Sequence, residues 1–157
     1  MDELSGHVLE AMDEELQAIK SAFFQATGRE SCLKILRLRD RLLVQYGDQI
    51  KDKSTLAKMV GTNQAYSMAR TPVIETADGV APNPKHRVVV DDIGWGLCVL
   101  VSVAERLGVA TTVMKMMIEW HQRIMGKEFL VNNRLSGQDC AELVRDSMPC
   151  LSLASTV

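Results

Sequence analysis

The sequence predicts an all-α fold, arranged as a single helical-bundle-like domain of about six to seven helices. Apolar residues recur at steps of three and four through much of the chain, which is the period of a helix with one buried face. Short strands do not alternate with helices, and neither glycine-rich phosphate-binding motif, GxGxxG or GxxxxGK(S/T), occurs. A nucleotide-binding α/β domain is therefore not expected within these 157 residues.

The composition is that of an ordinary globular protein. Apolar residues make up 46% of the chain and charged residues 24%, which argues against a disordered chain. The formal net charge is -2 and basic residues do not cluster, so we expect no nucleic-acid partner. The longest apolar run, residues 93–104, is too short to span a membrane, and the acidic N-terminus lacks the form of a signal peptide.

The cysteines and histidines do not form a metal-binding pattern. The four cysteines show no CxxC spacing and the three histidines lie far apart, so no metal site is expected. Reduced thiols in a cytoplasmic protein are the simplest interpretation. Cys98 is expected to pack in the core, because no base lies near it in the sequence.

The first helix is predicted from Leu4 to Phe23. Its apolar residues follow one another at steps of three or four, which gathers them on one face, and Gly28 provides an end. Ser31 is a suitable N-cap for a second helix that continues to about Gly47 with leucines on its inner face.

A short third helix, capped by Ser54 or Thr55, is predicted through Val60. The stretch NQAYSMARTPV then predicts one more short helical turn. That turn should end near Thr71, because Pro72 disfavours helix at the residue before it.

Residues 72–90 are predicted to form a long loop. Three of the four prolines lie here, together with the turn sequences ADG and NPK. Within this loop, HRVVVD (residues 86–91) is rich in β-branched residues and is expected to run extended for about five residues. Long ordered loops in compact domains are often functional.

Two further helices are predicted after this loop. The apolar run over residues 93–107 is long enough to favour a buried helix over a strand, and Gly108 ends it. Thr111 or Thr112 caps the next helix, which stops at Gly126.

The last predicted element is a small helix in LSGQDCAELVRD. Ser136 lies three residues before Asp139, as in a variant of the capping box. We expect residues 1–147 to form the helical domain and residues 148–157 to form a disordered tail.

An arginine and two aspartates stand where the buried helix is expected to begin. A carboxylate at a helix N-terminus accepts backbone N–H bonds and favours its ionised form, so Asp92 is suited to orient a catalytic histidine. Arg87 is suited to bind both oxygens of a substrate carboxylate. The simpler alternative is that Asp92 is only an N-cap and that Arg87 pairs with Asp91 on the surface.

The stretch HRVVVDDIGWGLCVLVSVAERLGVATTVMKMMIEWHQRIMGKEF resembles the signature region of the opine dehydrogenase family, which includes octopine and nopaline dehydrogenases. Arg87 falls on the family's arginine, Asp91 on its glutamate and Asp92 on its aspartate. Gly94 stands at a proline position of the family, and LGVATT replaces a proline-bearing turn. The resemblance covers nearly the whole chain, but only the helical, substrate-binding half of these enzymes.

The resemblance implies the fold of the C-terminal domain of opine dehydrogenases, which is 6-phosphogluconate dehydrogenase C-terminal-like. It implies an oxidoreductase that condenses an amino acid with a 2-keto acid and reduces the imine with NAD or NADP as cofactor. A Rossmann domain would hold the cofactor and the helical domain the substrates. Arg87 would bind a substrate carboxylate, and Asp92 would hold the catalytic histidine in its working tautomer.

In the family that histidine lies before the first long helix, in a segment that this chain lacks, and we do not transfer its role to His7. The N-terminal Rossmann domain is absent from the sequence as well. We therefore expect the isolated chain to hold no cofactor and to be inactive unless it is joined to, or partnered by, a Rossmann domain.

Three further residues are candidates for lining the substrate site. His86 adjoins Arg87, Trp95 lies one turn into the buried helix and could stack on a substrate, and Tyr66 precedes the long loop. The simpler alternatives are a solvated loop histidine for His86 and core packing for Trp95.

Two other functions stay open. The chain could be a non-catalytic helical module that binds a partner or forms a homodimer through an uncovered apolar face. The N-terminal stretch MDELSGHVLEAMDEEL also resembles the first helix of chorismate mutases, but the later helices do not supply the basic residues that such a site needs.

Overall fold

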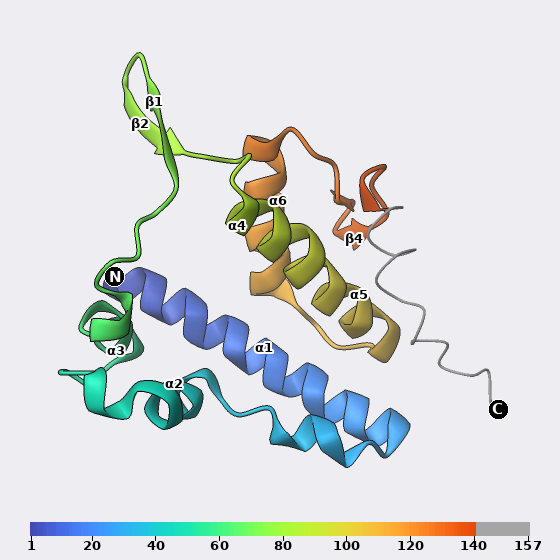
Figure 1. Cartoon of the computed structure of the whole chain (residues 1–157). Coiled ribbons are helices and arrows are strands. Elements are labelled where there is room, and N and C mark those ends of the chain that lie inside the picture. Colours follow the sequence, from blue (N-terminus) through green and yellow to red (C-terminus); the bar gives the residue numbers. More distant parts are fainter. Residues whose placement is uncertain (141–157) are drawn as a thin grey trace. The chain divides into compact units, whose positions relative to one another are not determined.

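The computed structural model describes residues 1–140, which divide into two compact units (Figure 1). The first unit is Met1–Thr71, and the second begins at Pro72. Helices dominate both units, which confirms the all-α prediction, and the second unit adds two short β-hairpins. Within residues 1–140, no helix is long and apolar enough to cross a membrane.

The first unit is entirely helical apart from an isolated bridge between Ile50 and Asn63. Its elements in chain order are α1 (Glu3–Thr27), the 3-10 helix η1 (Glu30–Lys34), α2 (Leu38–Tyr46), η2 (Gly47–Gln49), α3 (Leu56–Gly61) and η3 (Gln64–Tyr66).

Helix α1 confirms the first predicted helix. Asp2 caps it, because its carboxylate accepts a hydrogen bond of 2.7 Å from the backbone N–H of Ser5. Gly28 ends it in the left-handed conformation, with φ of 65°, which glycine adopts without a steric cost.

The predicted helix from Ser31 to Gly47 is wrong in its first half. The chain forms η1 and then runs extended before α2 begins. Two side chains of α1 explain the break, because Gln17 donates to the carbonyl of Leu36 and Lys20 donates to the carbonyl of Ile35. These tertiary hydrogen bonds engage carbonyl groups that a continuous helix would use internally.

Helix α3 confirms the third predicted helix and identifies its cap. The Thr55 hydroxyl accepts a hydrogen bond of 3.2 Å from the N–H of Lys58. Leu56 and Met59 of α3 form the core of this unit together with Leu42 and Ile50. The short turn predicted after α3 is present as η3, although it ends before Thr71.

Close packing of α1 on α3 at Gly6 gives the first prediction. A Cβ on Gly6 would lie 2.9 Å from Cβ of Ala57 and 3.1 Å from its backbone nitrogen. Gly6→Ala should therefore lower the free energy of unfolding by about 1–2 kcal/mol, since overpacking outweighs the gain in helix propensity. Urea unfolding of the chain measures this change.

Gly47→Ala is the matched control. Gly47 has an ordinary helical φ of -49°, and a Cβ there would meet nothing within 4 Å. We expect it to change stability by less than about 1 kcal/mol, in either direction. Equal destabilisation by the two variants would contradict the close approach of Gly6 to Ala57.

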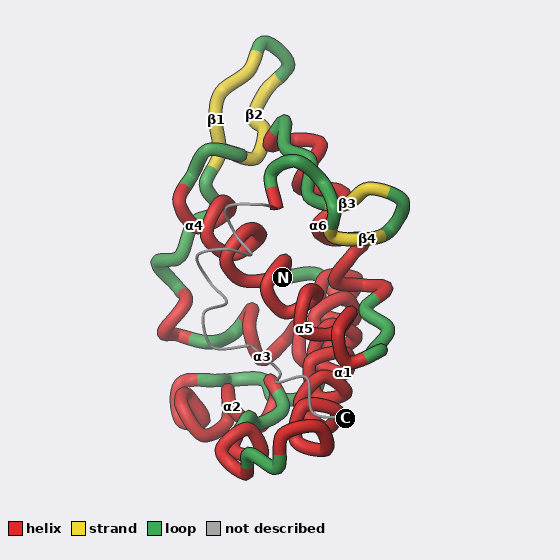
Figure 2. Tube along the Cα trace, turned by 90° about the vertical axis from the view of Figure 1, so that its right-hand side faces the viewer, coloured by secondary structure: helices red, strands yellow, loops and turns green. Residues whose placement is uncertain are grey.

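The second unit combines helices with two antiparallel hairpins, drawn in yellow in Figure 2. Its elements are β1 (Val73–Thr76), β2 (Gly79–Pro82), α4 (Arg87–Val90), the π-helical segment η4 (Asp91–Leu97), α5 (Cys98–Leu107), α6 (Thr112–Met125), β3 (Leu130–Val131) and β4 (Arg134–Leu135).

The prediction of a loop over residues 72–90 is wrong at both ends of that range. Its first part is the β1–β2 hairpin, paired in register from Val73 opposite Pro82 to Thr76 opposite Gly79. The turn chemistry of ADG was visible in the sequence, and Gly79 takes a positive φ of 129° there. The last part of the range is helical.

Helices α5 and α6 form the core of the second unit and confirm the two predicted helices. Val101 and Ala104 of α5 are fully buried, as is Ile118 of α6. Gly108 and Gly126 end the two helices in the left-handed conformation, as predicted. Thr111 occupies the N-cap position of α6, but its side chain makes no capping hydrogen bond.

Cys98 at the start of α5 is buried, as predicted. Burial, reinforced by the neighbouring Cys140, raises the pKa of the Cys98 thiol to about 12. The thiol is therefore protonated at neutral pH, which disfavours reaction as a nucleophile.

The capping box predicted for Ser136 and Asp139 does not form. The Asp139 carboxylate instead accepts hydrogen bonds of 2.8 Å from Lys127 Nζ and from the backbone N–H of Glu128. The rest of the predicted last helix, and the predicted tail over residues 148–157, lie outside the described residues.

These contacts give a pH-dependent prediction. The hydrogen bond from Lys127, followed by that from the Glu128 N–H, lowers the pKa of Asp139 below 3.8. The ionised Asp139 carboxylate stabilises the folded chain fully when the pH is above 3.8. This contribution to the free energy of unfolding is lost as the pH falls through the lowered pKa. Asp139→Asn should therefore destabilise the chain at neutral pH, and the difference from wild type should vanish well below 3.8.

Urea unfolding of the wild type and of Asp139→Asn, at neutral pH and at a pH well below 3.8, measures this difference in stability. Glu75→Gln, at an exposed carboxylate of β1, is the control and should leave stability unchanged. A difference for Asp139→Asn that persists undiminished in acid would contradict the assignment.

Candidate functional site

The candidate site lies on a continuous helical run over residues 87–107, composed of α4, η4 and α5 (Figure 1). His86 begins it, because its Nδ1 accepts a hydrogen bond of 3.3 Å from the N–H of Val88. The extended conformation predicted for residues 86–91 is therefore wrong. The capping interaction and the helical bond from Val89 N–H to His86 O prevail over the weak strand preference of three valines.

The earlier helix start also moves the two aspartates. Asp91 and Asp92 lie one turn inside the helix, so neither is the N-cap that the sequence suggested. Asp92 is therefore exposed on the helix and, in the described part of the chain, makes no capping hydrogen bond.

A π-helical turn carries the aspartates, which the sequence analysis did not foresee. The N–H of Cys98 donates to the carbonyl of Ile93, five residues earlier. Such turns are rare and are frequent at functional sites. The sequence feature that could have indicated this π-helical turn is the presence of two glycines, Gly94 and Gly96, inside an otherwise apolar helix.

Arg87 and Asp91 form an ion pair along the helix. Nε of Arg87 lies 2.8 Å from Oδ2 of Asp91, and the two side chains are 89% and 44% exposed. The hydrogen bond and charge of Asp91 raise the pKa of Arg87 above its usual value. This is the surface pair that the sequence left open as an alternative, and it leaves both Nη groups of Arg87 unbonded within residues 1–140.

Asp92 and Trp95 are exposed on the same helical run as Arg87. Both side chains face solvent, and Trp95 is 45% exposed, so it is not a core residue. Within residues 1–140, the Asp92 carboxylate accepts no hydrogen bond. An unpaired carboxylate and an arginine with two open Nη groups can therefore both meet a ligand here.

The structure brings four of the five predicted site residues onto one helical run, and Tyr66 is the exception. Tyr66 belongs to the first unit, where its ring packs on Tyr46 with centroids 5.4 Å apart. Partial burial, followed by the proximity of Tyr46, raises the pKa of Tyr66. Its contacts are those of a core tyrosine.

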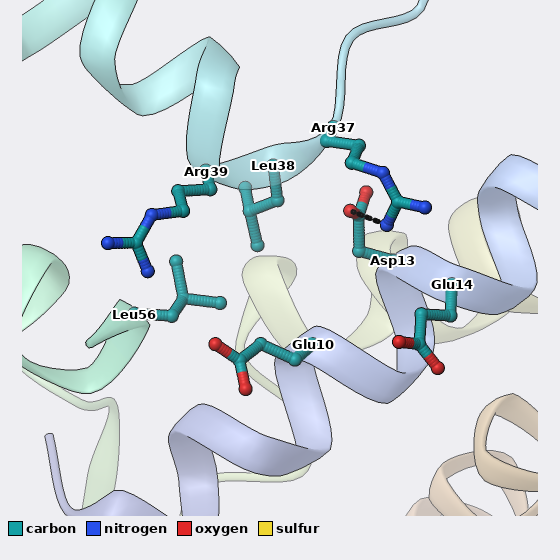
Figure 3. A pocket seen from close by; sticks show the side chains of 7 residues that line it. All are labelled: Glu10, Asp13, Glu14, Arg37, Leu38, Arg39 and Leu56. Atoms are coloured by element: carbon teal, nitrogen blue, oxygen red, sulfur yellow. Dashed lines mark ion pairs between the residues drawn. The ribbon is translucent and has the colours of Figure 1, made fainter. Parts of the chain in front are cut away.

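A charged groove of about 240 Å³ in the first unit was not predicted (Figure 3). It is lined by Glu10, Asp13 and Glu14 of α1, by Arg37, Leu38 and Arg39, and by Leu56 of α3. Arg37 lies 3.9 Å from Asp13, and Arg39 donates to the carbonyls of Lys53 and Ser54. The two arginines are thus already engaged within the unit.

Metal binding has no support in the described part of the chain. Residues 1–140 contain no group of three or more histidine, cysteine, aspartate or glutamate side chains arranged to hold an ion. The chemistry available at the helical run is that of a guanidinium and two carboxylates.

Comparison with known protein families places the chain that carries this helical run in one of them. Residues 1–125, which include the whole Arg87–Trp95 region, match the family described as NAD/NADP octopine/nopaline dehydrogenase, alpha-helical domain. The chain belongs to this family. The octopine/nopaline dehydrogenase resemblance of the sequence is thereby confirmed, as is its restriction to the helical domain.

Individual relatives agree with the family match. The chain is 29% identical to tauropine dehydrogenase of Arabella iricolor over 88% of its length and 30% identical to octopine dehydrogenase of Pecten maximus over 90%. It covers 35% of each of these proteins. The chain therefore spans about a third of the length of the curated octopine/nopaline dehydrogenase relatives it matches.

Solved structures of octopine dehydrogenase show the same fold. The structure with NADH and L-arginine matches 90% of this chain at a TM-score of 0.83 and 30% identity, and the chain covers 35% of it. A structure with NADH and agmatine gives the same TM-score, 0.83, and one with NADH and pyruvate gives 0.76.

Proposed function

We propose that this chain is the substrate-binding half of an NAD(P)-dependent opine dehydrogenase-like oxidoreductase, which condenses an amino acid with a 2-keto acid and reduces the imine. The observation that carries this proposal is the exposed pair Arg87 and Asp92 on a π-distorted helix, inside the region that matches the family. We assign residues 1–147 to this helical substrate domain.

Arg87 binds a substrate carboxylate in this proposal. Its two unbonded Nη groups have the fork geometry that matches two carboxylate oxygens, and its charge is permanent. Trp95 and His86 lie on the same helical run as Arg87, and in this proposal they line the bound substrate.

Asp92 orients a catalytic histidine contributed from outside this chain. An exposed, unpaired carboxylate accepts the Nδ1–H of an imidazole and so fixes which ring nitrogen faces the substrate. That histidine would then act as general acid/base at the keto oxygen. His7 is not that residue, since it lies on α1 and neighbours Glu10 at 3.5 Å.

NAD or NADP supplies the hydride when bound, but the described residues do not fit a dinucleotide. No strand in residues 1–140 leads through a glycine-rich turn into a helix, which is how Rossmann domains hold the pyrophosphate. We therefore assign the cofactor to a separate Rossmann domain. The free thiols of Cys32, Cys98 and Cys140 support a cytoplasmic location for the assembly.

A second candidate is a non-catalytic helical module that binds a partner or forms a homodimer. An exposed apolar stripe on α6 favours it, because Met116, Trp120 and Ile124 follow at four-residue steps and are 51%, 50% and 36% exposed. Analytical ultracentrifugation of the wild-type chain and of Trp120→Lys tests whether this stripe drives association.

A chimera tests the enzymatic proposal. In it, this chain replaces the matching helical part of Pecten maximus octopine dehydrogenase, so that the remaining part supplies the cofactor domain. The chimera should oxidise NADH or NADPH only when both a 2-keto acid and an amino acid are present. A folded chimera that is inactive with a panel of amino acids and 2-keto acids would contradict the enzymatic proposal and favour the non-catalytic interaction module.

A further inference from the structure

The geometry of the Arg87–Asp91 pair carries one more inference. A guanidinium offers two edges to a carboxylate: a side edge formed by Nε and one Nη, and an end edge formed by the two Nη groups. Asp91 engages Nε at 2.8 Å and so occupies the side edge. The end edge of Arg87 is left open.

We propose that Asp91 is a positioning residue, which holds Arg87 by its Nε so that the end edge of the guanidinium is presented to the substrate carboxylate. This inference rests on the proposed function of Arg87. It explains why a carboxylate follows the arginine by one helical turn, although it partly neutralises the charge that attracts an anionic substrate.

Asp91 is the better-fixed member of the pair. Its side chain is half as exposed as that of Arg87, 44% against 89%, and its backbone begins the π-helical segment. Ile93 and Gly94 of that segment are buried, which anchors the turn that carries Asp91. We therefore assign the restraint to the less exposed carboxylate and its effect to the more exposed arginine.

The Arg123–Glu119 pair on α6 provides a contrast within the same unit. It has the same separation of four residues and similar exposure, but Arg123 engages its carboxylate through Nη2. Nη2 belongs to both edges, so this contact does not leave the end edge of Arg123 open as the Nε contact leaves that of Arg87. A contact made through Nε alone is thus a feature of Arg87 and not a general result of four-residue spacing.

The first test observes the Nε–H group of Arg87 by NMR in the full 157-residue chain, with Arg87→Lys identifying the resonance. In the wild type this proton should exchange slowly with water, and Asp91→Ala should speed the exchange by about threefold or more. Asp91→Glu should restore part of the protection, and Glu119→Ala should have no effect. Equal exchange in wild type and Asp91→Ala would overturn the inference.

The second test measures kinetics of the chimera with pyruvate. Asp91→Ala should raise the KM for the carboxylate substrate bound by Arg87 about threefold to tenfold, with kcat changed less than about twofold. If Asp91 only neutralises Arg87, its removal would lower that KM, which would overturn the inference. An inactive wild-type chimera whose Arg87 Nε–H is still protected would refute the proposed function and leave the side-on restraint of Arg87 standing.

Discussion

Asp92→Asn in the chimera should lower kcat by about 100- to 10,000-fold, which is the range expected when general acid/base catalysis is disabled. An asparagine side chain can present its NH2 group where the carboxylate accepted a hydrogen bond, and it carries no charge to stabilise an imidazolium. The substrate-binding groups on the helix stay in place, so KM should change much less than kcat. Steady-state kinetics measure both constants.

Because Asp92 is exposed, Asp92→Asn should change catalysis without changing the stability of the chain. Within residues 1–140 its carboxylate accepts no hydrogen bond, so asparagine removes no structural contact from the described chain. Glu119→Gln, at an exposed carboxylate on α6, should leave kcat unchanged and serves as the control. A kcat for Asp92→Asn within threefold of wild type would show that Asp92 has no part in proton transfer.

Arg87→Ala should lower kcat/KM of the chimera by about 10- to 150-fold, mainly through a higher KM for the substrate whose carboxylate it binds. That range corresponds to the loss of about 1.5–3 kcal/mol for hydrogen bonds to a charged group. Arg87→Lys should recover only part of the loss, because an ammonium group keeps the charge but cannot fork two oxygens.

Arg123→Ala is the matched control for Arg87→Ala. Arg123 is a comparably exposed arginine with a carboxylate partner four residues away, and its removal should leave kcat/KM within about twofold of wild type. Equal losses in the two variants would indicate a general effect of positive charge and would contradict a specific role for Arg87.

Local sequence patterns were sufficient to predict those helices whose bounds are set by their own residues and caps. The first helix follows from its apolar spacing and from Gly28, and α6 follows from its periodicity and from Gly126. The break in the second predicted helix depends on Gln17 and Lys20, which lie more than a dozen residues away in the sequence. No periodicity within the helix itself could reveal those contacts.

The residues of the candidate site are a prediction from the sequence, and the structure changes the geometry expected for them. Arg87, Asp91 and Asp92 were recognisable from their order and from the family pattern. Their helical conformation was missed because β-branched residues such as Val88 suggest a strand when read alone, whereas the His86 cap and the helix that follows decide otherwise. The side-on contact between Nε and Asp91 is a matter of rotamers, which sequence does not specify.

Identifying the product of the chimera by mass spectrometry is the most direct test of the central claim. The condensation joins the amine to the keto carbon with loss of water, and NAD(P)H delivers a hydride to the imine. The account predicts a secondary amine whose mass is that of the amino acid plus the keto acid, less one oxygen atom. It also predicts at least about tenfold less of this product from Asp92→Asn and Arg87→Ala reactions run for the same short time at substrate concentrations below KM. Reduction of the keto acid to a hydroxy acid, or equal product from the variants, would contradict it.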